Sequence, residues 1–144
     1  MKKIVLILIG VSLSLTADFV RNDTTQVVTD SKTQLQWKDD AIGSSMTWTE
    51  AISHCESLTF ATYSDWRLPN VKELISLVDD SKRAPSLDTN VFKYTASDFY
   101  WSSTTYNYAP PPGKWYVNFD DGSQGYNDNG DSDSYYVRCV RAGQ

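Results

Sequence analysis

The sequence predicts an α+β domain with an antiparallel sheet, and three observations support this fold class. Apolar residues at helical spacing are confined to the middle of the chain, short β-prone runs with turn signals lie on both sides of it, and no internal repeat or long linker interrupts the 144 residues. Helices and strands that are segregated along a chain favour an antiparallel sheet. A chain of this length forms one domain of ordinary size.

The first strands are predicted between residues 27 and 37. Two short β-prone runs flank Asp30-Ser31-Lys32-Thr33, a stretch of turn-forming residues, so we expect a hairpin that ends at Trp37. A polar loop through Gly43 and Ser44 follows the hairpin.

Two helices are predicted next, and each is preceded by a helix N-capping motif. Thr47-Trp48-Thr49-Glu50 has the form of a capping box, and Asn70-Val71-Lys72-Glu73 is a second start signal. The apolar stripe of the first helix consists of Trp48, Ala51, Ile52, Cys55 and Leu58, and that of the second of Val71, Leu74, Ile75 and Val78. His54 lies off the first stripe, and we expect this side chain to be solvated.

The C-terminal third predicts short strands separated by polar loops. We expect strands at 100–104, 115–119 and 135–141, with Cys139 inside the last strand and a turn at Asp120-Asp121-Gly122. The polar loops cover residues 105–114 and 127–134. Binding residues are found more often on such loops than on regular elements.

Composition and charge exclude some functions. Lys and Arg number 13 against 18 Asp and Glu, for a net charge of −5, so no electrostatic attraction to nucleic acid or to an anionic membrane is expected. Hydrophobic residues make up 40% of the chain, which is enough for a core, and aromatic residues reach 13%, a high value.

The N-terminus resembles a secretory signal peptide. Lys2 and Lys3 precede an apolar run at 4–15, and the small residues Thr16 and Ala17 follow it. We predict cleavage after Ala17, which divides the chain into a signal peptide, 1–17, and one domain, 18–144, exported to the periplasm or the cell exterior. Cleavage leaves 11 basic and 18 acidic side chains. The alternative is an uncleaved anchor, although the run is short for a membrane span.

Cys55 and Cys139 are the two cysteines of the chain. In an exported protein an even count favours a disulfide, and this pair allows one connection, between positions 84 residues apart. The alternative is a catalytic or metal-binding thiol.

Several motifs resemble one known family, the Lcl C-terminal domain family. They lie in order along the chain and include the hairpin with Trp37, the helix with Cys55, the run Asp65-Trp66-Arg67-Leu68-Pro69, Tyr100-Trp101-Ser102-Ser103, Trp115-Tyr116-Val117-Asn118-Phe119 and Val137-Arg138-Cys139-Val140-Arg141.

The resemblance implies a C-type-lectin-like fold, related also to formylglycine-generating enzymes, in which a helix cysteine is bonded to a cysteine of the last strand. Family members are typically exported bacterial proteins, and the namesake is an adhesin domain that recognises sulfated polysaccharides behind a collagen-like trimerising stalk. This chain has no Gly-X-Y repeat, so the resemblance implies no trimer and the oligomeric state stays open. Its acidic charge argues against a surface for polyanions, which require clustered Arg and Lys.

The family motifs themselves are interpreted as structural. We expect a buried Trp66, an Arg67 paired with a carboxylate or carbonyl, and a Pro69 that starts the second helix. Trp101 and Trp115 are expected in the core, and Ser102-Ser103 at the polar end of a strand, because no Ser-His-Asp signature accompanies them.

The candidate ligand-binding residues lie in the two loops or directly before the second one: Tyr106, Asn107, Tyr108, Tyr126, Asp128, Asp131 and Asp133. Tyr106 and Tyr108 lie just before a stiff triple proline, and exposed tyrosine rings suit the apolar face and hydroxyl groups of a sugar. Asp128, Asp131 and Asp133, with Asn127 and Asn129, are calcium candidates, since Ca²⁺ prefers oxygen ligands. The alternatives are a loop that packs on its own domain and a solvated turn.

Together these observations favour an exported, non-catalytic recognition module, adhesin-like, that binds a glycan or a cell-surface ligand through its C-terminal-half loops. One alternative is a structural or assembly protein that binds a protein partner. The other is an enzyme, although the sequence contains no GxSxG elbow, zinc-ligand cluster or phosphate loop.

Overall fold

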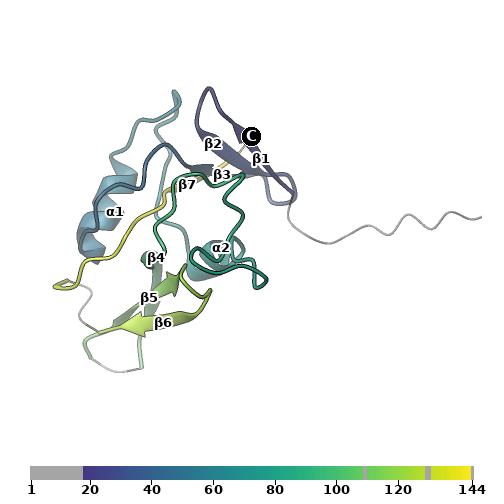
Figure 1. Ribbon diagram of the computed structural model, residues 1–144. Helices are drawn as coiled ribbons and strands as arrows, with labels where there is room; N and C mark the ends of the chain where they lie inside the picture. The colour runs from purple at the N-terminus through teal and green to yellow at the C-terminus, as the bar shows by residue number, and fades with distance from the viewer. Residues whose placement is uncertain (1–17, 109, 129–130, 144) are drawn as a thin grey trace, which may run out of the picture.

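The computed structural model of the protein describes residues 18–108, 110–128 and 131–143, and within them the fold is α+β, as predicted (Figure 1). Two helices and two antiparallel sheets make up this part of the chain. The elements, in order, are β1 (Phe19–Asn22), β2 (Val27–Asp30), β3 (Leu35–Lys38), α1 (Trp48–Glu56), α2 (Val71–Ile75), β4 (Phe99–Tyr106), β5 (Gly113–Asn118), β6 (Gln124–Asn127) and β7 (Val140–Ala142). The predicted signal peptide, 1–17, lies outside the described residues.

The first sheet has the strand order β1-β2-β3-β7, with every neighbouring pair antiparallel. The predicted hairpin is confirmed as β2 and β3. Its turn is held by the Asp30 carboxylate, which accepts hydrogen bonds from the Lys32 N–H at 2.9 Å and the Thr33 hydroxyl at 2.7 Å. Strand β1, which pairs with β2, was not predicted from the sequence. The C-terminal β7 pairs with β3 and forms the opposite edge of the sheet from β1 (Figure 1).

The second sheet has the order β4-β5-β6 and lies at the opposite end of the molecule from β1 and β2 (Figure 1). Its presence means that the strands divide between two sheets, whereas the sequence predicted one. The turn before β6 contains Gly122 with φ +81°, a left-handed conformation that glycine adopts without steric cost. β6 itself was not predicted, because its sequence, Gln-Gly-Tyr-Asn, contains no β-branched residue.

The prediction of one strand over 135–141 is wrong. Tyr135 and Tyr136 form isolated bridges to Met46 and Tyr100, and a regular strand begins only at Val140, so Cys139 lies just before β7. The reason is that this segment runs from the second sheet to the first, and a chain that changes partners cannot form one continuous ladder.

Both predicted capping boxes are confirmed. The Thr47 and Asn70 side chains accept the backbone N–H groups of Glu50 and Glu73, and each glutamate side chain accepts the backbone N–H of its N-cap at 2.9 Å. Helix α2 is shorter than the apolar spacing suggested, because after Ile75 the backbone continues with i→i−3 bonds in a turn. Pro69 precedes the N-cap and is not the first helical residue.

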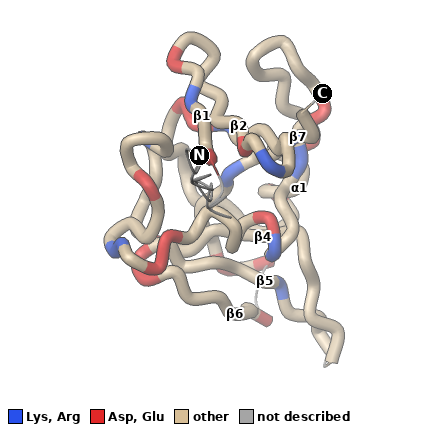
Figure 2. Tube along the Cα trace, turned by 90° about the vertical axis from the view of Figure 1, so that its right-hand side faces the viewer, with Lys and Arg blue, Asp and Glu red and all other residues tan. Residues whose placement is uncertain are grey.

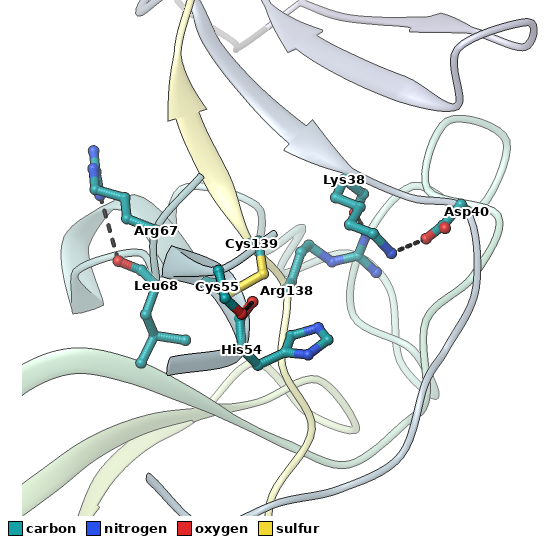
Figure 3. Close-up of a disulfide and its surroundings, with 9 residues drawn as sticks. Lys38, Asp40, His54, Cys55, Arg67, Leu68, Arg138 and Cys139 are labelled. Atoms are coloured by element: carbon teal, nitrogen blue, oxygen red, sulfur yellow. Dashed lines mark hydrogen bonds and ion pairs between the residues drawn. A yellow bond between two sulfur atoms is a disulfide. The ribbon is translucent and has the colours of Figure 1, made fainter. Parts of the chain in front are cut away.

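Two apolar clusters form the core. The first lies between the two sheets and α2 and includes Val28, Trp37, Leu74, Phe92, Tyr100, Val117 and Val140. The second lies against the buried face of α1 and includes Ala51, Cys55, Trp66, Leu68, Trp101 and Cys139. The Cys55–Cys139 disulfide is confirmed, with Cα atoms 5.5 Å apart, and it joins the buried face of α1 to the segment before β7 (Figure 3).

A buried ion pair joins distant parts of the chain to the first sheet. The Asp39 side chain has no solvent exposure, and it forms salt bridges with Arg21 and, at 2.6 Å, with Arg138. The same carboxylate accepts the backbone N–H groups of Lys93 and Tyr94 at 2.8 and 3.3 Å. One carboxylate therefore positions β1, the end of β3, the 91–95 segment and the residue before Cys139.

No helix within the described residues is long and apolar enough to cross a bilayer. The apolar run at 4–15 lies outside that part of the chain.

We predict that Asp39→Asn lowers the free energy of unfolding by about 3–5 kcal/mol, because it leaves Arg21 and Arg138 without their buried partner. Urea denaturation measures the loss. The matched control is Asp40→Asn at the next position, where a partly exposed carboxylate binds Lys38 and where the cost should be about 1 kcal/mol or less. Equal losses in the two variants would contradict the central role of Asp39.

We also predict that removing the disulfide by Cys55→Ala with Cys139→Ala costs about 4–5 kcal/mol, because the bond closes a loop of 84 positions. Denaturation of the oxidised protein and of the double variant measures this difference. Treating both proteins with reductant is the control, since only the oxidised protein should lose stability.

Candidate ligand-binding site

Four aromatic side chains gather at one end of the second sheet, and we call this group the tyrosine ladder: Tyr106, Tyr108, Trp115 and Tyr126. The Tyr106 ring is stacked against the Tyr126 ring, with centroids 4.4 Å apart, and against the Tyr108 ring at 5.4 Å. The edge-on Trp115 ring contacts Tyr106 at 6.2 Å and Tyr126 at 6.0 Å. Three of the predicted ligand-binding residues, from β4, the following loop and β6, are therefore brought together.

The strand register and one glycine explain why the rings meet. Trp115 pairs with Tyr126 across β5 and β6, and Tyr106 pairs with Gly113 across β4 and β5. A Cβ atom at Gly113 would lie 2.9 Å from Cδ2 of Tyr126 and 2.9 Å from Oδ1 of Asp128. Because Gly113 has no side chain, the Tyr126 ring can lean across β5 and stack on Tyr106.

The ladder is open to solvent along its outer part. Tyr108 is 90% exposed and Tyr126 is 46% exposed, whereas Tyr106 and Trp115 are half-buried. Trp115 was predicted to lie in the core, and the structure corrects this prediction in part. Val117, on the same strand face, is buried in the first apolar cluster. Trp115 lies nearer the start of β5, where its ring contacts Tyr106 and Tyr126.

The polar residues predicted for the site divide between two places. Asn107 and Asp128 are exposed close to the ladder. Oδ1 of Asp128 lies beside Gly113, the residue over which the Tyr126 ring passes. Asp131 instead accepts a 2.7 Å hydrogen bond from the Thr49 hydroxyl of α1. Asp133 accepts one of 2.8 Å from the Asn127 amide.

The predicted calcium ligands therefore point to different partners. Asn127 also donates to the Tyr135 hydroxyl at 2.6 Å, and burial raises the pKa of Tyr135. Among the described residues no group of three His, Cys, Asp or Glu side chains is arranged to hold a metal ion. Asn129 lies outside the described residues, and calcium binding by this loop stays a prediction.

The basic residue of the second sheet is directed to α1 and not to the ladder. Lys114 is the one Lys or Arg in β4, β5 and β6, and its ammonium lies 4.2 Å above the Trp48 ring of α1. Trp48 in turn donates its indole N–H to the Ser102 carbonyl at 2.8 Å, which fixes that ring on the sheet. Along the described trace, Figure 2 shows acidic and basic residues interspersed, with no basic stripe over the second sheet.

The family motifs serve structure, as predicted. Trp66 is buried and donates to the Phe60 carbonyl at 3.2 Å. Arg67 forms two hydrogen bonds to Glu73, of 2.8 and 2.7 Å. Burial opposes ionisation of Glu73, but the bonds from Arg67 and from the Asn70 N–H outweigh it, so the pKa of Glu73 is below its ordinary value.

Two further residues of the motifs have clear structural roles. Arg141 binds the Asp65 carboxylate at 2.6 and 3.1 Å, and its hydrogen bond lowers the pKa of Asp65. Ser102 lies inside β4 and is buried, with its hydroxyl donating to the Trp115 carbonyl at 2.9 Å, so the prediction of a polar strand end is wrong. His54 is exposed, as predicted.

These features define a disulfide-bonded α+β domain that presents an exposed aromatic surface on a small antiparallel sheet. The sequence model of the Lcl C-terminal domain matches residues 26–141, so the chain belongs to the Lcl C-terminal domain family. The matched range contains both cysteines and the whole tyrosine ladder. No curated protein matches the chain with significant similarity.

We predict that Gly113→Ala displaces the Tyr126 ring and costs about 1–3 kcal/mol, because the new methyl group would overlap the ring. NMR ring-current shifts of Tyr106 and Tyr126 detect the displacement, and urea denaturation measures the cost. In the Gly113→Ala, Tyr126→Ala double variant the two costs should be less than additive. Additive costs would show that Gly113 is not needed for the crossing of this ring.

Proposed function

We propose that this chain is an exported, non-catalytic recognition domain, adhesin-like, whose tyrosine ladder binds a glycan. The observation that carries the proposal is the stacked ladder itself, which leaves Tyr108 90% exposed. Burying apolar rings is the dominant favourable term in folding, so rings left in water on a stable sheet point to a ligand.

The chemistry of the ladder suits a sugar. The open face of Tyr108 offers a flat apolar surface for the C–H groups of a pyranose ring, and the tyrosine hydroxyls offer donors and acceptors for sugar hydroxyls. Tyr106 is already held between two neighbours, so ligand binding orders few side chains and costs little conformational entropy.

Export is supported by two features. The N-terminal residues have the pattern of a signal peptide, and the disulfide is typical of an oxidising compartment, the periplasm or the cell exterior. The C-type-lectin-like fold implied by the family motifs agrees with a recognition role.

The charges favour a neutral glycan over a sulfated one. Sulfate groups require clustered Arg and Lys, but Arg67, Arg138 and Arg141 are each paired with a carboxylate. Lys114 lies over Trp48, and Asp128, close to the ladder, would repel an anion.

We predict that Tyr108→Ala weakens glycan binding about 5–30-fold while the melting temperature is unchanged, because the ring is almost fully exposed. A glycan array probed with residues 18–144 identifies the ligand, and titration of that ligand gives the affinities. The control is Tyr94→Ala, a 37% exposed tyrosine of the 91–95 segment, which should bind as the wild type does.

The array is probed once with calcium and once with chelator. Because Asp131 and Asp133 are hydrogen-bonded to Thr49 and Asn127, we expect binding to survive the chelator. Binding that requires calcium would restore the acidic loop as a metal site. Wild-type affinity in Tyr108→Ala would remove the ladder as the site. A blank array would favour the structural alternative, a protein partner, which mass measurement in solution then tests.

A further inference from the structure

A small cavity lies beside the disulfide, away from the tyrosine ladder. Its volume is about 60 Å³, and its walls include Lys38, Ser44, His54, Tyr94 and Arg138. Figure 3 shows the Arg138 side chain extending from the segment that carries Cys139, with the His54 ring on one side of it and Lys38 on the other. The cavity is therefore bordered by the end of β3, the loop after it, α1 and the segment before β7.

Arg138 has one donor that the described residues leave without an acceptor. The side chain is 97% buried, and its two terminal nitrogens bind Asp39, the Lys38 and Tyr94 carbonyls and the Thr95 hydroxyl at 2.6–3.2 Å. The Nε–H is buried and has no partner within that part of the chain. A buried charged donor without an acceptor costs more free energy than most single hydrogen bonds contribute.

The buried charges next to Arg138 do not balance, although Arg138 and not Arg21 lines the cavity. Arg21 and Arg138 are both buried, and they share one buried carboxylate, Asp39. The second carboxylate that Arg21 binds is Asp23, which is 71% exposed and also paired with Lys93. Water screens an exposed carboxylate strongly, so the two buried guanidinium groups are compensated only in part. The other charged side chain of the cavity wall, Lys38, is paired with Asp40.

We propose that this cavity binds a small monovalent anion, with the Arg138 Nε–H as its donor. One negative charge would compensate the shared guanidinium pair, and the acceptor would complete the hydrogen bonding of Arg138. The volume admits chloride or the carboxylate of formate, whereas a divalent sulfate would overcompensate the charge. Chloride and formate share this chemistry, and the experiments distinguish them. The site is separate from the ladder, so its failure would leave the glycan proposal untouched.

The first test is crystallographic. Crystals of the exported, disulfide-bonded protein are grown in bromide, and an anomalous difference map is computed. We expect a bromide peak within hydrogen-bonding distance of Arg138 Nε. Ordinary density without an anomalous peak, as a water molecule gives, or no density at all, would overturn the proposal.

The second test measures whether the anion stabilises the fold. At equal ionic strength, the melting temperature is compared in chloride, formate and gluconate, whose polyol chain is too large for the cavity. We expect chloride or formate, whichever binds more tightly, to raise the melting temperature above its value in gluconate. The expected increase is about 3–6 °C at a tenfold excess of the anion over its Kd. Equal melting temperatures in the three salts would contradict an anion site.

Matched variants assign the effect to Arg138. Arg138→Met should abolish the anion-specific increase, whereas Arg141→Met, which removes an equally buried, carboxylate-paired arginine three positions away, should retain it. An increase that persists in Arg138→Met would refute the assignment. If Arg138→Met does not fold, the bromide map of the wild-type protein decides the question.

Discussion

The buried carboxylate of Asp39 is the interaction on which the rest of the structure depends. It holds Arg21 of β1, Arg138 of the C-terminal segment and the backbone of the 91–95 segment. An ionised group without solvent exposure is tolerated only when charged and hydrogen-bonding partners surround it. The first sheet therefore closes only when residues from three distant parts of the sequence reach Asp39 together.

Four consecutive residues of the C-terminal motif also make contacts with distant parts of the sequence. Arg138 binds Asp39, Cys139 is bonded to Cys55, Val140 is buried in the first cluster, and Arg141 binds Asp65. The four residues therefore tie the C-terminal segment to parts of the chain that are far apart in sequence. This explains, in physical terms, why the motif that carries the family resemblance serves the architecture, whereas the tyrosine ladder lies on the second sheet, at a distance from these contacts.

The two sheets accordingly have different tasks. The first sheet, the disulfide and the arginine pairs make a rigid frame, and the second sheet carries the exposed rings at the end that α2 leaves uncovered. A recognition surface benefits from this division, because substitutions in the loops around Tyr108 would leave the core contacts unchanged. The exposed rings depend on Gly113, because the absence of a side chain there allows Tyr126 of β6 to stack on Tyr106 of β4.

The sequence by itself determined the features that depend on neighbouring residues: both capping boxes, the β2–β3 hairpin and the position of the turn at Gly122. The single possible cysteine pair and the proximity of Tyr106 to Tyr108 could also be predicted from it. Only the tertiary structure decided the separation into two sheets, the strands β1 and β6, and the partners of Asp39. It also placed Trp115 beneath Tyr126. The physical reason is that strand pairing and buried charge compensation join residues far apart in the chain, and local propensity and spacing do not specify such partners.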